Sequence, residues 1–315
     1  MKQMLRPLAA LGAIGLLAGP APAQRNEAPY VLVEKGRGFT RLQDAVDAIG
    51  NGSGTIRFAP RRFADCAVQS RGDIAYVAAV PGKAVLDGVT CQGKAALVLG
   101  GRSARIEGLV FTDMAVPDRN GAGIRLERGD LSVSQAWFRD SEQGILTASD
   151  PKGRIVIDKS TFTRLGTCAG SGGCAHSVYV GEYGALTITR SRFEAGTGGH
   201  YVKSRAPRVE ITGSSFDDTA GRATNYMIDL PDGATGRIAN NWFVQGRDKE
   251  NYSAFVAVAA RARVNSSDGL VISDNDARFA PGVSRRSTFV ADWSGQRLEI
   301  SGNRLANSLR RYEPR

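Results

Sequence analysis

Long apolar runs, helical periodicity and histidine are all scarce in this sequence. After the first 24 residues, no stretch reaches the roughly 20 apolar residues of a membrane-spanning helix, so no transmembrane segment is expected. Apart from one segment at 39–49, apolar residues do not recur at helical spacing, which leaves short strands as the expected elements. Histidine occurs only twice among 315 residues, at His176 and His200.

The first 23 residues have the composition of a secretory signal peptide. Two basic residues precede an apolar run at 8–19, and Ala21-Pro22-Ala23 supplies small residues before an expected cleavage site. The apolar run is too short to cross a bilayer as a helix. We therefore expect residues 24–315 to form a single exported domain, periplasmic or extracellular.

The charge balance favours acidic partners. The formal net charge is +10, and removal of the basic residues Lys2 and Arg6 with the signal lowers it to +8. An exported basic protein meets acidic polymers, such as uronate polysaccharides or cell-surface glycans, more often than nucleic acid. A generally cationic surface without a ligand is the alternative. We expect a monomer.

Four cysteines in an oxidising compartment predict two disulfides. Cys168 and Cys174 bracket a glycine-rich loop, and Cys66 and Cys91 are 25 residues apart, about one period of the repeat described below. An alternative is a zinc site formed by Cys168, Cys174 and both histidines, since zinc prefers these ligands.

A repeated phrase decides the expected fold. A short alternating strand ends in Asn, Ser or a similar polar residue and then, usually, an aromatic residue or Leu. Its copies recur 23–34 residues apart, at 106–111, 133–138, 157–162, 188–193, 211–216, 238–243, 272–277 and 300–305. Asn241, Asn275 and Asn303 fall in one column, as in an inward-facing asparagine ladder. Trp137 and Trp242 share another column, where they could stack on sugar rings or be ordinary surface or core aromatics.

A second strand lies between successive copies, and it places an apolar residue at the centre of the triplets 123–125, 144–146, 177–179, 201–203 and 226–228. Stacked coils of such strands would bury a continuous core. We predict an all-β, right-handed parallel β-helix with coils at about 54–305. An amphipathic helix at about 39–49 would cap the first coil, and residues 306–315 would form a frayed tail.

The capping helix, the strand beginning Gly54-Thr55-Ile56 and the repeated Asn/Ser-x-Phe phrases resemble secreted right-handed parallel β-helix proteins of the pectate-lyase superfamily. The resemblance extends from about Tyr30 to Leu305. It implies a substrate groove on the outer face of one parallel sheet. The superfamily includes lyases, hydrolases, epimerases and non-catalytic members, so the fold alone does not fix the activity.

The candidate site is built on two phrases 24 residues apart, His176-Ser-Val-Tyr179 and His200-Tyr-Val-Lys203. Neighbouring coils would align the two histidines, and would align Tyr179 with Lys203, with these four side chains pointing mostly outward or lying at a bend. Arg205 follows on the same strand. We place the expected substrate-binding residues on neighbouring coils; these are Arg125, Asn225 in the column of His200, and Asp229 in the column of Ser204.

These residue types match the needs of β-elimination from a uronate polymer. Arg205 could hold and neutralise the substrate carboxylate. Lys203 or a histidine could abstract the proton, and Tyr179 could protonate the leaving oxygen or share acid and base duty with His200. We predict an exported polysaccharide lyase acting on an acidic polysaccharide.

Other chemistries are less well matched. Glycoside hydrolysis needs a pair of carboxylates, and no second acid joins Asp229. An aspartate-rich calcium site is not evident, so no cofactor is predicted, although Ca²⁺ use stays open. A uronate epimerase would need much the same residues. The remaining alternative is a non-catalytic glycan-binding or envelope-structural solenoid, in which the His and Tyr side chains form ladders without chemistry.

Overall fold

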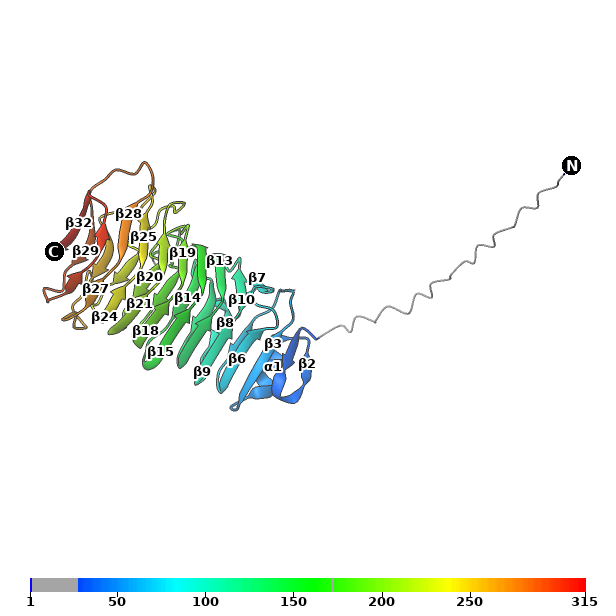
Figure 1. The fold of residues 1–315 in the computed structure, drawn as a ribbon. Coiled ribbons are helices and arrows are strands. Elements are labelled where there is room, and N and C mark those ends of the chain that lie inside the picture. Colours follow the sequence, from blue (N-terminus) through cyan, green and yellow to red (C-terminus); the bar gives the residue numbers. More distant parts are fainter. Residues whose placement is uncertain (2–27, 171–172) are drawn as a thin grey trace.

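A computed structural model describes Met1 and residues 28–170 and 173–315. The expected signal peptide lies outside these described residues. The chain forms a parallel β-solenoid of about nine turns with 4% helix, and its coils stack in chain order from the N-terminal to the C-terminal end (Figure 1). The predicted fold class is confirmed. No helix in the described part is long and apolar enough to cross a membrane.

Each coil contributes one strand to each of three sheets, named A, B and C here. Sheet A contains β1 Tyr30–Leu32, β2 Arg37–Phe39, β3 Ser53–Phe58, β6 Asp73–Ala78, β9 Ser103–Glu107, β12 Asp130–Ser134, β15 Asp150–Asp158, β18 Tyr183–Thr189, β21 Arg208–Thr212, β24 Thr235–Ala239, β27 Val271–Ser273 and β30 Glu299–Ser301. Its first two strands are antiparallel additions, and the rest are parallel.

Sheet B contains β4 Arg62–Phe63, β7 Ala84–Asp87, β10 Leu109–Thr112, β13 Trp137–Ser141, β16 Thr161–Leu165, β19 Arg192–Glu194, β22 Ser215–Asp217, β25 Trp242–Gln245, β28 Asp276–Phe279 and β31 Arg304–Leu305. Sheet C contains β5 Ala67–Gln69, β8 Ala95–Leu99, β11 Ala122–Leu126, β14 Gln143–Thr147, β17 Val178–Val180, β20 Val202–Ser204, β23 Ile228–Leu230, β26 Ala254–Val258, β29 Ser287–Asp292 and β32 Leu309–Pro314.

The predicted helix caps the first coil as α1 Leu42–Ile49, after a short 3-10 turn, η1 Val33–Lys35. Its buried residues Leu42, Ala45 and Val46 join the core and cover the otherwise open end of the solenoid. The helix begins three residues later than expected, where the Leu42 amide donates to the carboxylate of Asp65 at 2.8 Å.

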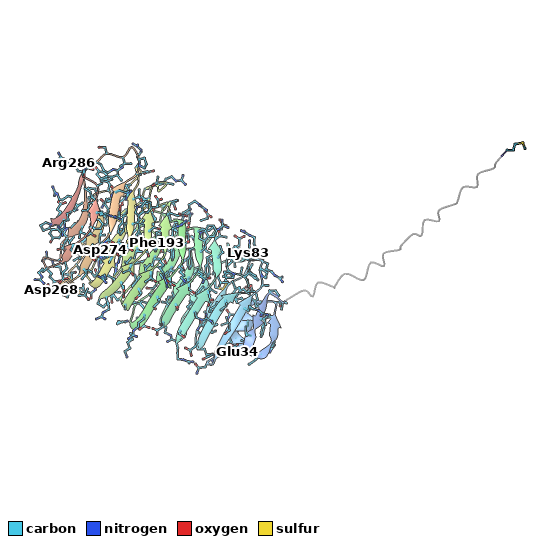
Figure 2. The ribbon with its side chains drawn as sticks, viewed as in Figure 1. Glu34, Lys83, Phe193, Asp268, Asp274 and Arg286 are labelled. Atoms are coloured by element: carbon cyan, nitrogen blue, oxygen red, sulfur yellow. A yellow bond between two sulfur atoms is a disulfide. The ribbon has the colours of Figure 1, made fainter. Side chains whose placement is uncertain are left out.

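The repeated phrases align in register in sheet B. Six fully buried phenylalanines stack with ring centroids 4.7–4.9 Å apart and nearly parallel planes, and Phe193 of this column is labelled in Figure 2; the six are Phe111, Phe138, Phe162, Phe193, Phe216 and Phe243. Ala277 and Leu305 continue the column. The stack forms a continuous core along the solenoid axis.

Corners of only two residues join sheet A to sheet B from β12 onward. The first corner residue adopts positive φ, as at Lys159 (47°), Arg190 (48°) and Asn240 (56°). The second is Ala136 in the first of these corners and a polar residue in all the following ones, where its side-chain oxygen accepts a hydrogen bond from the preceding coil's backbone. The predicted asparagine ladder is confirmed, and serines extend it, giving Ser160, Ser191, Ser214, Asn241, Asn275 and Asn303.

Both predicted disulfides are present, with Cα–Cα separations of 5.5 Å for Cys66–Cys91 and 4.1 Å for Cys168–Cys174. The prediction of a frayed tail at 306–315 was wrong. These residues include β32, which pairs in parallel with β29, because Tyr312 aligns with Val290 and its hydroxyl donates to Asp292 at 2.9 Å.

Candidate active site

Tyr179, Lys203 and Asp229 share one column of sheet C, and Arg205 follows directly after β20. Tyr179 in β17 pairs with Lys203 in β20, as expected, and Lys203 pairs with Asp229 in β23. The expected pairing of Asp229 with Ser204 was wrong by one residue. Gly199 bridges Thr224, but Val202 pairs with Ile228, so one extra residue is accommodated between these two points. The irregularity brings a carboxylate beside the lysine.

The two histidines are aligned but do not point into solvent. They lie in the bends before β17 and β20, where His176 is 5% and His200 9% exposed. Each stands two residues before an inward-facing valine, Val178 or Val202. Both therefore take the second of the two expected placements, a bend, and both are buried there. The His176 ring lies 5.4 Å from the Tyr179 ring, centroid to centroid.

A hydrogen bond assigns the tautomer of His176. The Nδ1 atom of His176 accepts the backbone N–H of His200 at 3.0 Å, so it carries no proton. The Nδ1 atom of His200 lies 3.2 Å from the same nitrogen. Burial lowers the pKa of His176 to about 3, and burial, followed by the proximity of His176 and of the Lys203 and Lys249 ammonium groups, lowers that of His200 well below its usual value. Both rings are neutral at neutral pH.

Asp229 links the histidine and the lysine. Its Oδ2 atom is 3.6 Å from the Nε2 atom of His200 and 3.6 Å from the Nζ atom of Lys203. Burial raises the pKa of the Asp229 carboxyl to about 6, although the Lys203 ammonium opposes the shift. The carboxylate therefore holds the Lys203 ammonium by an ion pair between neighbouring strands.

Tyr179 and Arg205 supply polar groups that are free to meet a ligand. The Tyr179 hydroxyl and the terminal amino groups of Arg205 make no hydrogen bond within the described residues. The Arg205 guanidinium lies 5.5 Å from the centre of the Tyr179 ring, and the Lys203 ammonium 5.8 Å from it. Burial raises the pKa of Tyr179, which keeps the phenol protonated and able to donate.

Two residues beside Arg205 were not predicted. Asp232 is 2% exposed and accepts two hydrogen bonds from Arg261, at 2.6 and 2.7 Å, and its carboxylate lies 3.9 Å from the Nε atom of Arg205. Asp232 is therefore paired mainly with Arg261. Arg205 is only loosely tied, by the longer contact at 3.9 Å. Both new residues lie in irregular connections, where the strand repeat carries no signal.

Two of the predicted substrate contacts are already engaged within the protein. Arg125 shares the outer column with Tyr179 through Leu146, two strands away, and its guanidinium donates to Glu127 at 3.2 Å. Asn225 donates through its side-chain amide to Glu250. Neither makes a hydrogen bond or ion pair with Lys203 within the described residues, whereas the side chain of Asn225 lies beside His200.

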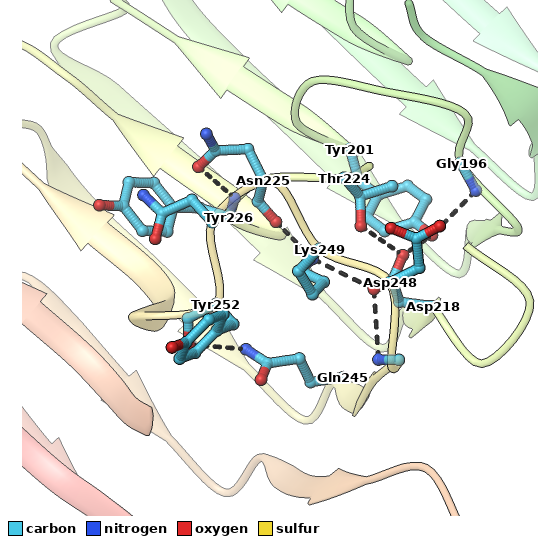
Figure 3. A network of polar contacts seen from close by, with 12 residues as sticks. Gly196, Tyr201, Asp218, Thr224, Asn225, Tyr226, Gln245, Asp248, Lys249 and Tyr252 are labelled. Carbon is cyan, nitrogen blue, oxygen red and sulfur yellow. Dashed lines mark hydrogen bonds and ion pairs between the residues drawn. The ribbon is translucent and has the colours of Figure 1, made fainter. Parts of the chain in front are cut away.

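A buried polar network supports the bend that carries Asn225 (Figure 3). The Lys249 ammonium, fully buried, lies 3.1 Å from Asp218 and donates to the backbone carbonyl of Asn225. Tyr201 and Thr224 donate hydroxyl hydrogen bonds of 2.7 and 2.8 Å to the same aspartate. Tyr201 follows His200 directly, so this network holds two neighbouring coils of the site in fixed register.

The zinc alternative is contradicted, because the sulfur atoms of Cys168 and Cys174 are bonded to each other. Among the described residues, no group of three or more His, Cys, Asp or Glu side chains is placed to hold a metal ion. A cavity of about 680 Å³ lies on the outer face of sheet A, and another of about 530 Å³ lies beside Trp242 of sheet B. In the cluster itself the side chains of Lys203 and Arg205 are 22% and 27% exposed.

No protein-family model and no curated protein matches the sequence. Solved structures with a similar fold include an alginate lyase from Paenibacillus sp. str. FPU-7, with a TM-score of 0.67, 17% identity, and coverage of 86% of this chain and 94% of that one. ORF18 of Geobacillus virus E2 has a TM-score of 0.49, 14% identity, and coverage of 84% and 55%. The Streptococcus pneumoniae surface protein and adhesin PfbA has a TM-score of 0.47 and 10% identity, with coverage of 86% of this chain and 94% of that one. The first likeness supports the β-solenoid fold.

Proposed function

We propose that this protein is an exported lyase that cleaves a uronate-containing polysaccharide by β-elimination. The observation that carries the proposal is one region of sheet C, in which a free tyrosine hydroxyl, a partly exposed lysine and a loosely tied arginine lie beside two buried, neutral histidines. Two disulfides fit an oxidising compartment outside the cytoplasm. Membership of the pectate-lyase superfamily is part of the same proposal.

Arg205 is the group that would hold the substrate carboxylate. Its terminal N–H groups have no partner within the described residues, and guanidinium binds carboxylate in a bidentate manner. Neutralising that charge makes the adjacent carbon acidic enough to lose its proton. Asp232 limits the rotation of the guanidinium through its contact at 3.9 Å.

We assign proton abstraction to Lys203 and protonation of the leaving oxygen to Tyr179. A base must first reach the substrate. The side chain of Lys203 is 22% exposed, whereas both imidazoles are buried. His200 and Asp229 then act on Lys203 by positioning it. The raised pKa of Tyr179 favours its role as the acid.

A panel of uronate polymers, with ultraviolet absorbance of the unsaturated products as the readout, tests the function. Alginate is the first polymer to try, because one solved structure with a similar fold is that of an alginate lyase. Release of unsaturated products is the expected result. Binding without new chain ends would support the non-catalytic glycan-binding alternative, and altered sugar configuration without cleavage would support an epimerase.

Variants then test the assigned roles on the confirmed substrate. Lys203→Ala and Tyr179→Phe should each lower turnover by about 10²–10⁴, the range for general acid and base groups, without loss of stability. Arg205→Ala should lower turnover and also raise KM, since it would bind the carboxylate in ground and transition states. Lys83→Ala, an exposed lysine outside the site, is the matched control. Near-normal turnover in Lys203→Ala and Tyr179→Phe would remove this column as the active site.

The pH profile separates the two candidate bases. A general base works only in its unprotonated form. A histidine base would be fully active by neutral pH, because burial lowers the pKa of His200. A plateau beginning below about pH 6.5 would transfer the role of base to His200.

A further inference from the structure

A second column of exposed polar and aromatic side chains follows the outer face of sheet B. Successive pairs in the parallel register define it, and we call it the tryptophan column; its members are Trp137, Thr161, Arg192, Ser215, Trp242, Asp276 and Arg304. The column belongs to a different sheet from Tyr179 and Lys203, so it is separate from the proposed catalytic residues.

Both tryptophans of this column are exposed, Trp137 by 40% and Trp242 by 37%. They lie four strands apart, which corresponds to about 19 Å at the usual strand spacing. An exposed indole presents a flat apolar face that stacks on the apolar face of a sugar ring. The indole N–H of Trp137 donates to Thr163 at 3.3 Å, whereas that of Trp242 makes no hydrogen bond within the described residues.

Trp242 borders a cavity of about 530 Å³ that also contacts Arg192, Ser215 and Arg304. Arg192 is 63% exposed at its side chain, and the nearest carboxylate, Glu194, is 3.8 Å away, beyond hydrogen-bond distance. The acidic member of the column, Asp276, is matched by Arg278 at 2.6 Å and Arg304 at 3.4 Å. The cavity therefore offers an exposed guanidinium, held by a single ion pair at 3.8 Å and by no hydrogen bond within the described residues, beside a stacking surface.

We propose that the tryptophan column is a second, non-catalytic binding site for a uronate-containing glycan chain. Trp242 stacks on one sugar ring, Arg192 binds a carboxylate in a bidentate manner, and Ser215 between them bonds a ring hydroxyl. The spacing along the parallel strands places these three groups in a line that an extended chain can follow. Binding here holds a polymer on the protein while sheet C acts on another part of it.

Tryptophan fluorescence reads out this column, which carries two of the three tryptophans; the third, Trp293, follows β29 of sheet C, so Trp293→Phe is introduced into every titrated protein to remove its signal. Titrations use sodium alginate and polygalacturonate at about 0.15 M salt, where long-range attraction is screened, with dextran as the neutral control. The parent protein for all titrations is Lys203→Ala, so that the polymer stays intact. Saturable quenching by at least one uronate polymer and none by dextran is expected.

Three variants identify the site. Arg192→Gln should raise the Kd about tenfold through loss of the charge-assisted contact. Trp242→Ala should weaken binding similarly, measured by calorimetry, while Trp242→Phe retains most of it. Arg237→Gln, which removes an exposed arginine from sheet A, is the matched charge control and should leave the Kd unchanged.

The outcomes separate this proposal from the catalytic one. Turnover of short soluble oligomers should be unchanged in Trp242→Ala made on the wild-type chain, while turnover of the polymer at low concentration falls. Equal affinity in Arg192→Gln, Trp242→Ala and Arg237→Gln would overturn the binding site even if the lyase activity is found. Quenching by dextran as strong as by alginate would overturn its assignment to acidic glycans. Specific binding without any lyase activity would leave this site standing and reject only the proposed reaction.

Discussion

Removal of the buried lysine below the candidate site should cost far more stability than its single ion pair suggests. Lys249 and Asp218 are both fully buried, 3.1 Å apart. In Lys249→Met the aspartate keeps its hydrogen bonds from Tyr201 and Thr224 but loses its countercharge. Breaking one partner of a buried pair costs about 3–5 kcal/mol. At about 2 °C per kcal/mol for a domain of this size, the melting temperature should fall by about 6–10 °C.

The assay is a set of thermal and denaturant melts with two comparisons. Lys94→Met breaks an ion pair with Glu127 in which the lysine side chain is 45% exposed, so its cost should stay below about 1 kcal/mol. The double variant Lys249→Met with Asp218→Asn leaves no unpaired charge and should recover much of the loss. A Lys249→Met protein no less stable than Lys94→Met would refute the reasoning.

Three further predictions concern the core, the corner ladder and the site. Phe162→Ala removes a fully buried ring stacked between two others and should lower the unfolding free energy by about 3–5 kcal/mol, while Phe162→Leu should cost less, as denaturant melts would show. Asn241→Ala leaves the Ser214 amide and the Ile211 carbonyl unpaired and should lower the unfolding free energy by about 2–6 kcal/mol. Asn241→Ser retains a hydrogen-bond acceptor, as elsewhere in the ladder, and should lower it less. Equal melting temperatures for the two variants would contradict the importance of the ladder. Asp229 has a raised folded-state pKa of about 6, so its contribution to stability is present below about pH 4 and is lost as pH rises through 6. The difference in unfolding free energy between wild type and Asp229→Asn should therefore change by about 1–3 kcal/mol between these pH values. A difference that does not depend on pH would argue against this prediction.

The sequence predicted those features in which each coil repeats the same residue type at the same place. The phenylalanine stack and the asparagine ladder could be found because Phe162 and Asn241 stand at fixed positions in a phrase with constant corners. The same phrases aligned Tyr179 with Lys203 correctly.

Residues in connections of variable length could not be placed in this way. The position of Asp229 was wrong by one because the irregularity after Thr224 has no signature in the triplets. Asp232, Arg261 and Lys249 reach the site from segments without a counterpart in other coils. Their pairing depends on three-dimensional contacts between loops, which a repeat does not encode.

The constant two-residue corners between sheets A and B have a consequence for how the chain tolerates changes in length. The connections on either side of sheet C vary widely, since Glu142 alone joins β13 to β14, whereas 166–177 join β16 to β17 and 259–270 join β26 to β27. Each two-residue corner places the next strand of sheet B in the same register as the strand before it in the sheet. An insertion beside sheet C therefore does not shift the register of the coils that follow it. The stacked core acts as a constant frame, and the surroundings of the open face can be exchanged by loop grafting, one coil at a time.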